Sequence, residues 1–407
     1  MLPYSPFQPE DLGPLAEVIP GPEPPLKLAL SRVPVVQGTD AIIPVCEPTL
    51  RGNEERYVVE CIRTNWISSA GHFVTRFEDM FREFCGTRYA IATTSGTTAL
   101  QLALYTLGIG EGDEVLIPTF TMIASANTVR HCGAIPVFVD AEPRTWNIDV
   151  ARIEATVTPR TKAIVPVHTY GHPADMDPIL DVARRHHLLV IEDAAEAHGA
   201  VYKGRPVGSL GVCGCFSFYA NKIITTGEGG MITTDDEELA AKARNVRDHA
   251  FSAERHFWHR ARGHNFRMTN LQGAVGVAQM ERADWLVERR IENARFYSAR
   301  LRDVRGITLP PSTEGVKNVY WMYAILIGDD FPRPRDEVRR WLAESAIETR
   351  SFFIPMHLQP LYHRPEYAGR FPVAEDLCRR GLYLPSSASL TEEQIDFVCA
   401  RIKALAR

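Results

Sequence analysis

The sequence predicts an α/β protein in which a large, doubly wound, mixed or mostly parallel sheet domain is followed by a smaller α+β domain. Short apolar runs alternate with amphipathic stretches from Ala41 onward, which is the pattern of a parallel sheet covered by helices. After about Arg282 this pattern gives way to longer charged helices. The 407 residues, 45% of them hydrophobic, are enough to form two domains.

The first forty residues are expected to form an arm outside the sheet, because prolines at positions 20, 22, 24 and 25 exclude a regular helix or a central strand. The large domain is predicted over residues 41–284. Its strands are predicted at Tyr89–Thr93, Glu114–Pro118, Ile135–Val139, Ala163–Pro166, Leu188–Glu192, Cys213–Ser217 and Gly230–Thr233. Helices such as Thr97–Leu107 and Ala174–His186 are predicted between them.

The small domain is predicted over residues 285–407. Its elements are a long charged helix over Trp285–Arg302, a strand pair around Val319–Ile327 and an amphipathic helix near Arg335–Ser345.

Composition argues for small-molecule chemistry inside the cell. The 45 Lys and Arg against 50 Asp and Glu give a net charge of −5, which argues against nucleic acid or an anionic membrane as the main partner. The eight cysteines are widely spread and are expected to be free thiols, so the cytoplasm fits best. Neither a basic start followed by an apolar run nor a run of ~18 apolar residues occurs, so we expect no export and no membrane span. No metal site is expected, because the Cys213–Cys215 and His186–His187 pairs lack further ligands.

The turn after the first predicted strand is a candidate phosphate site. Small residues lead from Tyr89–Thr93 into a helix, and the first N–H groups of a helix bind anions. Gly96, Thr97 and Thr98 would hold the phosphate. The commoner alternative is that the hydroxyl residues only cap the helix.

Asp193 ends a buried strand at its carboxyl end, where open α/β sheets place their sites. A pyridinium nitrogen would suit this carboxylate, because an ionised Asp keeps that nitrogen protonated and the ring electron-poor. A helix-capping Asp is an equally open alternative.

Lys222 lies between an aromatic strand and a glycine-rich turn. Desolvation would lower its pKa, so that the neutral amine could form a Schiff base with an aldehyde and later move protons. A structural lysine that extends its amine to the surface is the alternative. Each of these three features has an alternative interpretation when it is taken alone. A phosphate turn, a strand-end Asp193 and Lys222 in this order together form a specific signal for the chemistry just described.

These segments carry a resemblance. Glu192–Gly199, Phe216–Met231 and Gly263–Asn270 resemble the DegT-like family of nucleotide-sugar aminotransferases, over about Ile43 to the C-terminus. The last two segments look most similar to GDP-perosamine synthases, which aminate C4 of a 4-keto-6-deoxy sugar. The resemblance implies the type I fold of pyridoxal-phosphate (PLP) transferases, as in aspartate aminotransferase.

The resemblance also implies roles for single residues. Lys222 would form the internal aldimine, Asp193 would pair with the pyridine nitrogen and Glu196 would lie near the phenolic oxygen. Gly96, Thr97 and Ser217 would contact the cofactor phosphate.

Asn265 would reach that phosphate from the neighbouring subunit of a homodimer. The family usually places an aromatic ring over the cofactor where this chain has Met122. A thioether can also cover an aromatic face, and Phe120, on the same face of an extended chain, could compensate.

The resemblance also implies a set of substrate contacts. The residues expected near the sugar and its nucleotide are Trp66, Ile67, Ser68, His168, Arg350 and His357. The run His249–Arg267, which includes Arg267, interleaves cations with aromatic residues. It is expected to cross the dimer interface and offer cations to a diphosphate, with a nucleic-acid surface or a merely solvated loop as alternatives.

The implied reaction is transfer of an amino group, with L-glutamate as donor and 2-oxoglutarate as its product, through the pyridoxamine form of the cofactor. The acceptor would be a nucleotide-linked keto sugar, as in O-antigen amino-sugar biosynthesis. Alternatives are a 3-keto sugar or cyclitol aminotransferase of the same family and a non-catalytic regulator on the same fold. A PLP-dependent sugar dehydratase is a further rival, against which Lys222 argues.

Overall fold

The large sheet is mixed, with one strand reversed. The structure, a computed structural model, describes residues 9–21, 42–255 and 257–406. Within these ranges a seven-stranded sheet has the order β1-β9-β8-β5-β4-β2-β3. Its strands are β1 (Tyr89–Thr93), β2 (Glu114–Pro118), β3 (Ile135–Val139), β4 (Thr161–Ile164), β5 (Leu189–Asp193), β8 (Cys213–Ser217) and β9 (Gly230–Thr234). Only β9 is antiparallel to its neighbours, and every strand is mainly buried, which explains the nearly continuous apolar runs.

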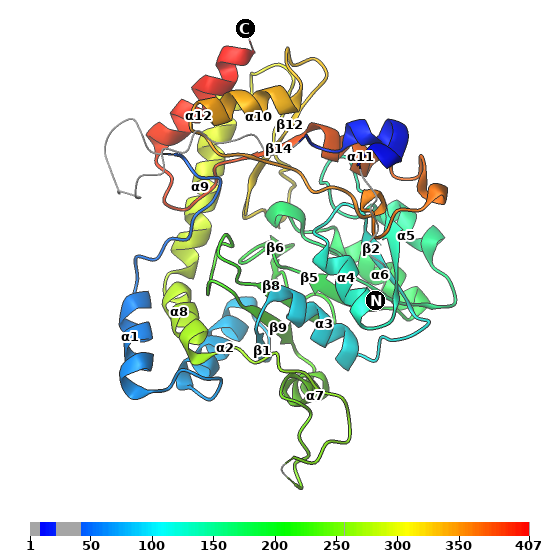
Figure 1. Ribbon diagram of the computed structural model, residues 1–407, viewed down its shortest axis with the longest axis vertical. Coiled ribbons are helices and arrows are strands. Elements are labelled where there is room, and N and C mark those ends of the chain that lie inside the picture. The colour runs from blue at the N-terminus through cyan, green and yellow to red at the C-terminus, as the bar shows by residue number, and fades with distance from the viewer. Residues whose placement is uncertain (1–8, 22–41, 256, 407) are drawn as a thin grey trace.

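Helices cover both sides of this sheet (Figure 1). They are α1 (Glu54–Thr64), α2 (His72–Cys85), α3 (Gly96–Thr106), α4 (Ala124–His131), α5 (Val150–Thr156), α6 (Met176–His186), α7 (Glu237–Arg247) and α8 (Asn270–Met280). α1, α2 and α8 pack together on one side, where Phe77 and Phe81 of α2 contact the rings of Phe216 and Phe218.

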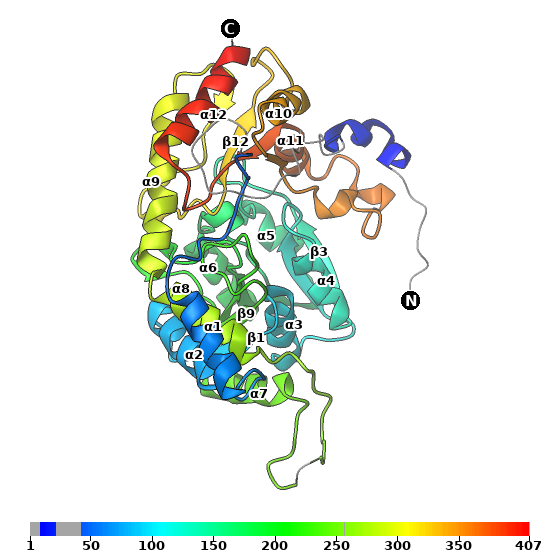
Figure 2. The same cartoon turned by 60° about the vertical axis from the view of Figure 1, so that its left-hand side comes forward.

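A second, smaller sheet follows along the chain. It has the order β10-β12-β14-β13 and is antiparallel throughout, with strands β10 (Ile307–Thr308), β12 (Tyr323–Ile327), β13 (Arg350–Ser351) and β14 (Gly381–Leu384). Its helices are α9 (Ala283–Leu301), α10 (Arg335–Glu344), α11 (Pro372–Arg380) and α12 (Glu392–Leu405), and short 3-10 turns lie at Met356–Leu358 and Pro365–Tyr367. α9 runs from α8 to the side of α12 (Figure 1, Figure 2).

Two hydrophobic cores meet along α9 and β12. The first half of α9 packs on the large core through Leu286 and Val287, and its second half packs on the small core through Tyr297 and Leu301. Side chains of β12 alternate between the two cores, as the period of a strand requires. Since the cores interlock here, the domain boundary at 284/285 stays a prediction.

The expected strand pair around Val319–Ile327 is wrong. β12 is the only strand there, and β11 (Val316–Lys317) pairs instead with β6 (Val201–Tyr202), which also pairs with β7 (Arg205–Pro206). The segment between β11 and β12 is not extended, because it packs closely against the 3-10 turn Thr169–Gly171. There the Val319 N–H donates to the Gly171 carbonyl at 3.1 Å, and Tyr320 has a φ of 47°.

Part of the N-terminal arm is described. Residues Pro9–Val18 form a 3-10 helix that is interrupted at Gly13, where φ is 57°, and that lies against α11. Residues 1–8 and 22–40 of the expected arm, which include the prolines at 22, 24 and 25, fall outside the described residues. Among the described helices, none is long and apolar enough to cross a membrane.

Candidate active site

Four strands end at the same edge of the large sheet. β1, β2, β5 and β8 run in one direction, and their carboxyl ends lead into the segments that the sequence marks. Gly96 follows β1, Met122 follows β2, Asp193 ends β5 and Lys222 follows β8. This edge is where open α/β sheets bind ligands.

Lys222 is almost closed off from water. Its side chain is 10% exposed, and Nζ lies 4.0 Å from Glu196 Oε1. Nζ also lies 3.6 Å from the centre of the Trp321 ring. Burial lowers the pKa of the Lys222 ammonium, whereas the charges of Glu196 and Asp193 act in the opposite direction. The neutral amine is therefore more accessible than in an exposed lysine.

Asp193 is a buried carboxylate with defined hydrogen bonds. Its Oδ2 accepts from Ser125 Oγ at 2.8 Å, and its Oδ1 accepts from the Ala195 N–H at 3.2 Å. Burial raises its pKa, and these two hydrogen bonds together with the charge of Lys222 oppose the rise. Turns, rather than a helix, follow Asp193, so it does not cap a helix. A buried carboxylate without an adjacent cation is costly, and a pyridinium N–H would supply the missing partner.

Glu196 completes the acid–base set. Its Oε2 accepts from the Tyr170 N–H at 2.7 Å, while Oε1 faces Lys222. Burial raises the pKa of Glu196 to about 7, an effect that the Lys222 charge opposes and the Asp193 charge reinforces. Such a carboxyl can hold or release a proton near neutral pH.

The start of α3 forms a small cradle. A Cβ on Gly96 would lie 2.6 Å from Ser217 Cβ, so only glycine allows this close approach of the turn to the end of β8. Ser95 Oγ accepts from the Thr98 N–H at 3.1 Å, and Thr98 Oγ1 accepts from the Ser95 N–H at 3.0 Å. The capping interpretation therefore holds for the Thr98 side chain. The first N–H groups of the helix, at Gly96 and Thr97, have no partner within the helix and can bind an anion.

These groups fit pyridoxal phosphate. An amine, a buried carboxylate, a carboxyl with a pKa of about 7 and a helix N-terminus beside Ser217 match its aldehyde, ring nitrogen, phenolic oxygen and phosphate. The chain thus offers one group of suitable chemistry for each polar part of the cofactor.

Phe120 does not compensate for the missing aromatic residue. It is fully buried and packs against Tyr170, Phe352 and Phe353 at centroid distances of 5.8–6.1 Å, so no surface is left for a cofactor ring. Met122, in contrast, is 49% exposed, three residues before the Ser125 that binds Asp193. Met122 is therefore the better placed of the two.

Neither predicted substrate histidine is available to a substrate. His168 Nε2 lies 3.1 Å from Glu192 Oε2, and its Nδ1 accepts from the Ala174 N–H at 3.0 Å. His357 is similarly enclosed, with Nδ1 2.8 Å from Thr119 Oγ1 and Nε2 3.2 Å from a carboxylate oxygen of Glu375. Both imidazoles are buried, so we correct their assignment to structural side chains that hold the loops around the site.

The remaining predicted contacts lie at the surface. Trp66, Ile67 and Ser68 are exposed after α1, and Asn270 fixes this segment through the carbonyls of Trp66 and Ser68, both at 2.7 Å. Arg350 lies in β13, which pairs with β14, and it forms an ion pair with Glu348.

Asn265 and Arg267 lie at the base of a hairpin that extends away from the body after α7 (Figure 2). Asn265 is exposed and forms an antiparallel bridge with Asp248, and Arg267 forms an ion pair with the same aspartate. Neither residue is among the groups around Lys222 of its own chain. Residue 256 of the predicted interface run falls outside the described residues.

The sequence does not single out Trp321, whose ring faces the amine. Its Nε1–H donates to the Asn221 carbonyl at 2.8 Å, and its own carbonyl accepts from Arg290 Nη1 at 2.8 Å. No local motif marks this tryptophan, because it is nearly 100 residues from Lys222 and is brought there by tertiary packing alone. Ser125 could have been found, since it lies in the first turn of the helix after Met122.

Comparisons with known proteins agree with this geometry. Residues 48–403 match the model of the DegT/DnrJ/EryC1/StrS aminotransferase family. The chain is 51% identical to a GDP-perosamine synthase of Caulobacter vibrioides, over 88% of this chain and 97% of that protein. It is 44% identical to a GDP-perosamine synthase of Escherichia coli O157:H7, with the same coverage of 88% and 97%. Among solved structures, it is similar to S. venezuelae DesV in complex with a ketimine intermediate. That similarity has a TM-score of 0.85 and 34% identity, over 90% of this chain and 99% of DesV.

Proposed function

Because the chain belongs to the DegT/DnrJ/EryC1/StrS aminotransferase family, we propose that it transfers the amino group of L-glutamate to a 4-keto-6-deoxyhexose carried on GDP. It is an aminotransferase, and its family depends on pyridoxal phosphate. The identity to two GDP-perosamine synthases supports GDP as the nucleotide and C4 as the position that receives nitrogen. The observation that carries the proposal is the buried Lys222 amine, held between the Glu196 carboxyl and the face of Trp321.

When bound, pyridoxal phosphate supplies an electron sink and a carrier for the amino group. Lys222 Nζ would hold the cofactor covalently and, when released, take the proton from the α-carbon of the amino acid. In the return half of the cycle, the same Nζ would deliver a proton to the sugar carbon that receives the nitrogen. The lowered pKa of Lys222 suits both steps, because an amine that was always protonated could not accept a proton.

The two carboxyl groups would have different tasks. Asp193 would stay ionised opposite the ring nitrogen, and its hydrogen bonds from Ser125 and Ala195 favour the charged form. Glu196 would share a proton with the phenolic oxygen, for which a pKa of about 7 is suitable. Gly96, Thr97 and Ser217 would anchor the phosphate at the start of α3.

We further propose a homodimer in which the hairpin after α7 reaches the partner. Two large apolar side chains on this hairpin, Phe257 and Trp258, are 76% and 54% exposed. A second exposed apolar group lies at and after the end of α1, with Ile62, Trp66 and Ile67 each 50–59% exposed. Groups of large exposed apolar side chains are a feature of protein interfaces. Light scattering should give twice the mass of 45.6 kDa, and Phe257→Ser with Trp258→Ser should shift the mass toward one chain.

The proposed reaction is tested by offering 4-keto-6-deoxyhexoses on GDP, UDP and dTDP to the PLP-loaded protein with L-glutamate. We expect 2-oxoglutarate and amino sugar in equal amounts, formed fastest with GDP. Formation with UDP or dTDP sugars alone would overturn the choice of nucleotide. Release of no more than one 2-oxoglutarate per cofactor with every sugar, while Lys222→Ala still lost the cofactor's absorbance band, would overturn the acceptor class but not the role of Lys222.

A further inference from the structure

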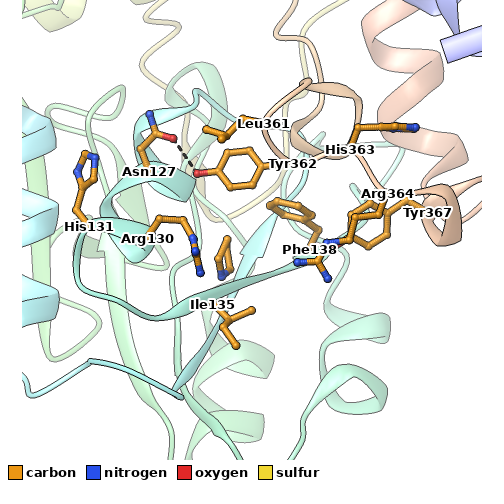
Figure 3. Close-up of a pocket in the computed structure, with 11 residues that line it drawn as sticks. Asn127, Arg130, His131, Ile135, Phe138, Leu361, Tyr362, His363, Arg364 and Tyr367 are labelled. Carbon is orange, nitrogen blue, oxygen red and sulfur yellow. Dashed lines mark hydrogen bonds between the residues drawn. The ribbon is translucent and has the colours of Figure 1, made fainter. Parts of the chain in front are cut away.

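A cavity lies outside the group of residues around Lys222. Its volume is about 450 Å³, within the range of ~300–1,000 Å³ that small-molecule sites occupy. It opens between α4, the edge strand β3 and the segment 361–367, and none of the proposed cofactor residues lines it (Figure 3). One face of α4 directs Ser125 to Asp193, while Asn127, Arg130 and His131 line this cavity.

The charged groups of the cavity are all of one kind. Arg130 enters from α4 and Arg364 from the segment 361–367, and the imidazoles of His131 and His363 add hydrogen-bonding groups. No Asp or Glu occurs among the described residues that line it. Arg130 Nη1 donates to the Ala134 carbonyl at 3.2 Å, which orients its guanidinium and leaves further N–H groups for a ligand. An anion is therefore the ligand that this lining favours.

Aromatic rings supply another part of the wall, beside the aliphatic Ile135, Pro136 and Leu361. The Phe138 ring packs edge-on against Tyr362 and Tyr367, at centroid distances of 5.7 and 5.8 Å. Tyr362 is fixed by its hydroxyl, which donates to Asn127 Oδ1 at 2.8 Å (Figure 3). Arg364 lies over the Tyr367 ring, 5.9 Å from its centre. Cations and aromatic faces thus lie side by side in one cavity.

We propose that this cavity is a second ligand site, which binds a nucleotide through its phosphates and its base. The phosphates would bind the guanidinium groups of Arg130 and Arg364, since planar guanidinium groups pair well with phosphate oxygens. The base would lie against the aromatic wall, where stacking contributes for any base. The inference is independent of the proposed reaction, because a chain that bound GDP here but aminated no sugar would retain it.

Calorimetric titration of the full-length, PLP-loaded protein with GDP tests the site, and the double variant Arg130→Gln with Arg364→Gln removes it. We expect the double variant to bind one GDP fewer per chain, or to bind at this site at least about tenfold more weakly, since each lost charge-assisted hydrogen bond costs roughly that factor. Arg144→Gln with Arg305→Gln is the matched control, because both arginines are more than 85% exposed and neither lines the cavity. An unchanged GDP isotherm in the double variant would overturn the proposal.

Two further titrations separate a nucleotide from a simple anion. Pyrophosphate and guanosine should each bind at least about tenfold more weakly than GDP if phosphate and base both contribute. If pyrophosphate binds as tightly as GDP, the aromatic wall has no role and the nucleotide assignment is wrong. Arg130→Lys should keep part of the affinity, because it retains the charge but loses the planar fork. Equal losses in Arg130→Lys and Arg130→Gln would contradict the expected contribution of the charge, and unchanged affinity in both would exclude Arg130.

Discussion

The contact between Lys222 and Trp321 gives a quantitative prediction for the amine. Nζ lies 3.6 Å from the centre of the indole ring, and this face favours the charged ammonium. A desolvated cation–π contact contributes about 2 kcal/mol. At this site we expect a phenyl ring to stabilise the Lys222 ammonium by about 1 kcal/mol more than an aliphatic side chain does. At a given pH below the pKa of Lys222, about 1 kcal/mol corresponds to about fivefold more neutral amine in Trp321→Leu than in Trp321→Phe.

Comparison of these two variants isolates the ring face, because both lose the indole hydrogen bond to the Asn221 carbonyl. Attachment of pyridoxal phosphate to the cofactor-free protein requires the neutral amine and can be followed by absorbance. Since loss of the ring lowers the pKa of Lys222 further, the pH profile of the attachment rate should move to lower pH in Trp321→Leu. Identical profiles in the two variants, or a shift to higher pH in Trp321→Leu, would refute the reasoning. The latter would mean that water entering the vacated space outweighs the lost ring.

Three other changes should have distinct effects. Gly96→Ala places a Cβ against Ser217 and should weaken cofactor binding about tenfold or more in a spectroscopic titration, because backbone at the phosphate cradle must move. Ser125→Ala removes a hydrogen bond to the buried Asp193 carboxylate and should lower turnover by about one to two orders of magnitude, a loss of about 1.5–3 kcal/mol. Burial raises the pKa of Glu196 to about 7, so ionising it costs stability as the pH rises from about 4.5 to 7. The melting temperature of the cofactor-free protein should therefore fall more steeply over this interval than that of Glu196→Gln.

Each of these predictions has its own check. Gly110→Ala is the control for the cradle, because its Cβ would meet no atom closer than 3.9 Å, and equal cofactor affinity in both alanine variants would contradict the steric argument. For Ser125→Ala, full turnover would show that the hydroxyl does not support Asp193. A parallel pH dependence of melting in the native chain and Glu196→Gln would assign the effect to other groups.

The sequence was most informative where local chemistry and strand direction act together. β1 and β8 have the predicted bounds, and β5 differs by one residue at each end, because central strands are continuous apolar runs closed by turn residues. The placement of Asp193 and Lys222 at one edge follows from the shared direction of β5 and β8.

The misassignments concern contacts between distant segments. His168 and His357 lie in segments next to the site. Only the packed structure shows that their Nε2 atoms contact the carboxylates of Glu192 and Glu375. The failed strand pair around Val319–Ile327 has the same origin, because its apolar residues pack on the 3-10 turn at Thr169–Gly171 instead of pairing with each other. Periodicity cannot distinguish these two kinds of burial.

Strand β12 is shared by both cores, and Trp321 lies two residues before its first residue. Any substitution that loosens the smaller sheet, even one far from the cofactor, would therefore displace the indole ring that faces Lys222. Damage to distant packing would then show itself as altered acidity of a single amine before the protein loses its overall shape. The pKa of that amine would therefore report on how well the large and the small core pack against each other.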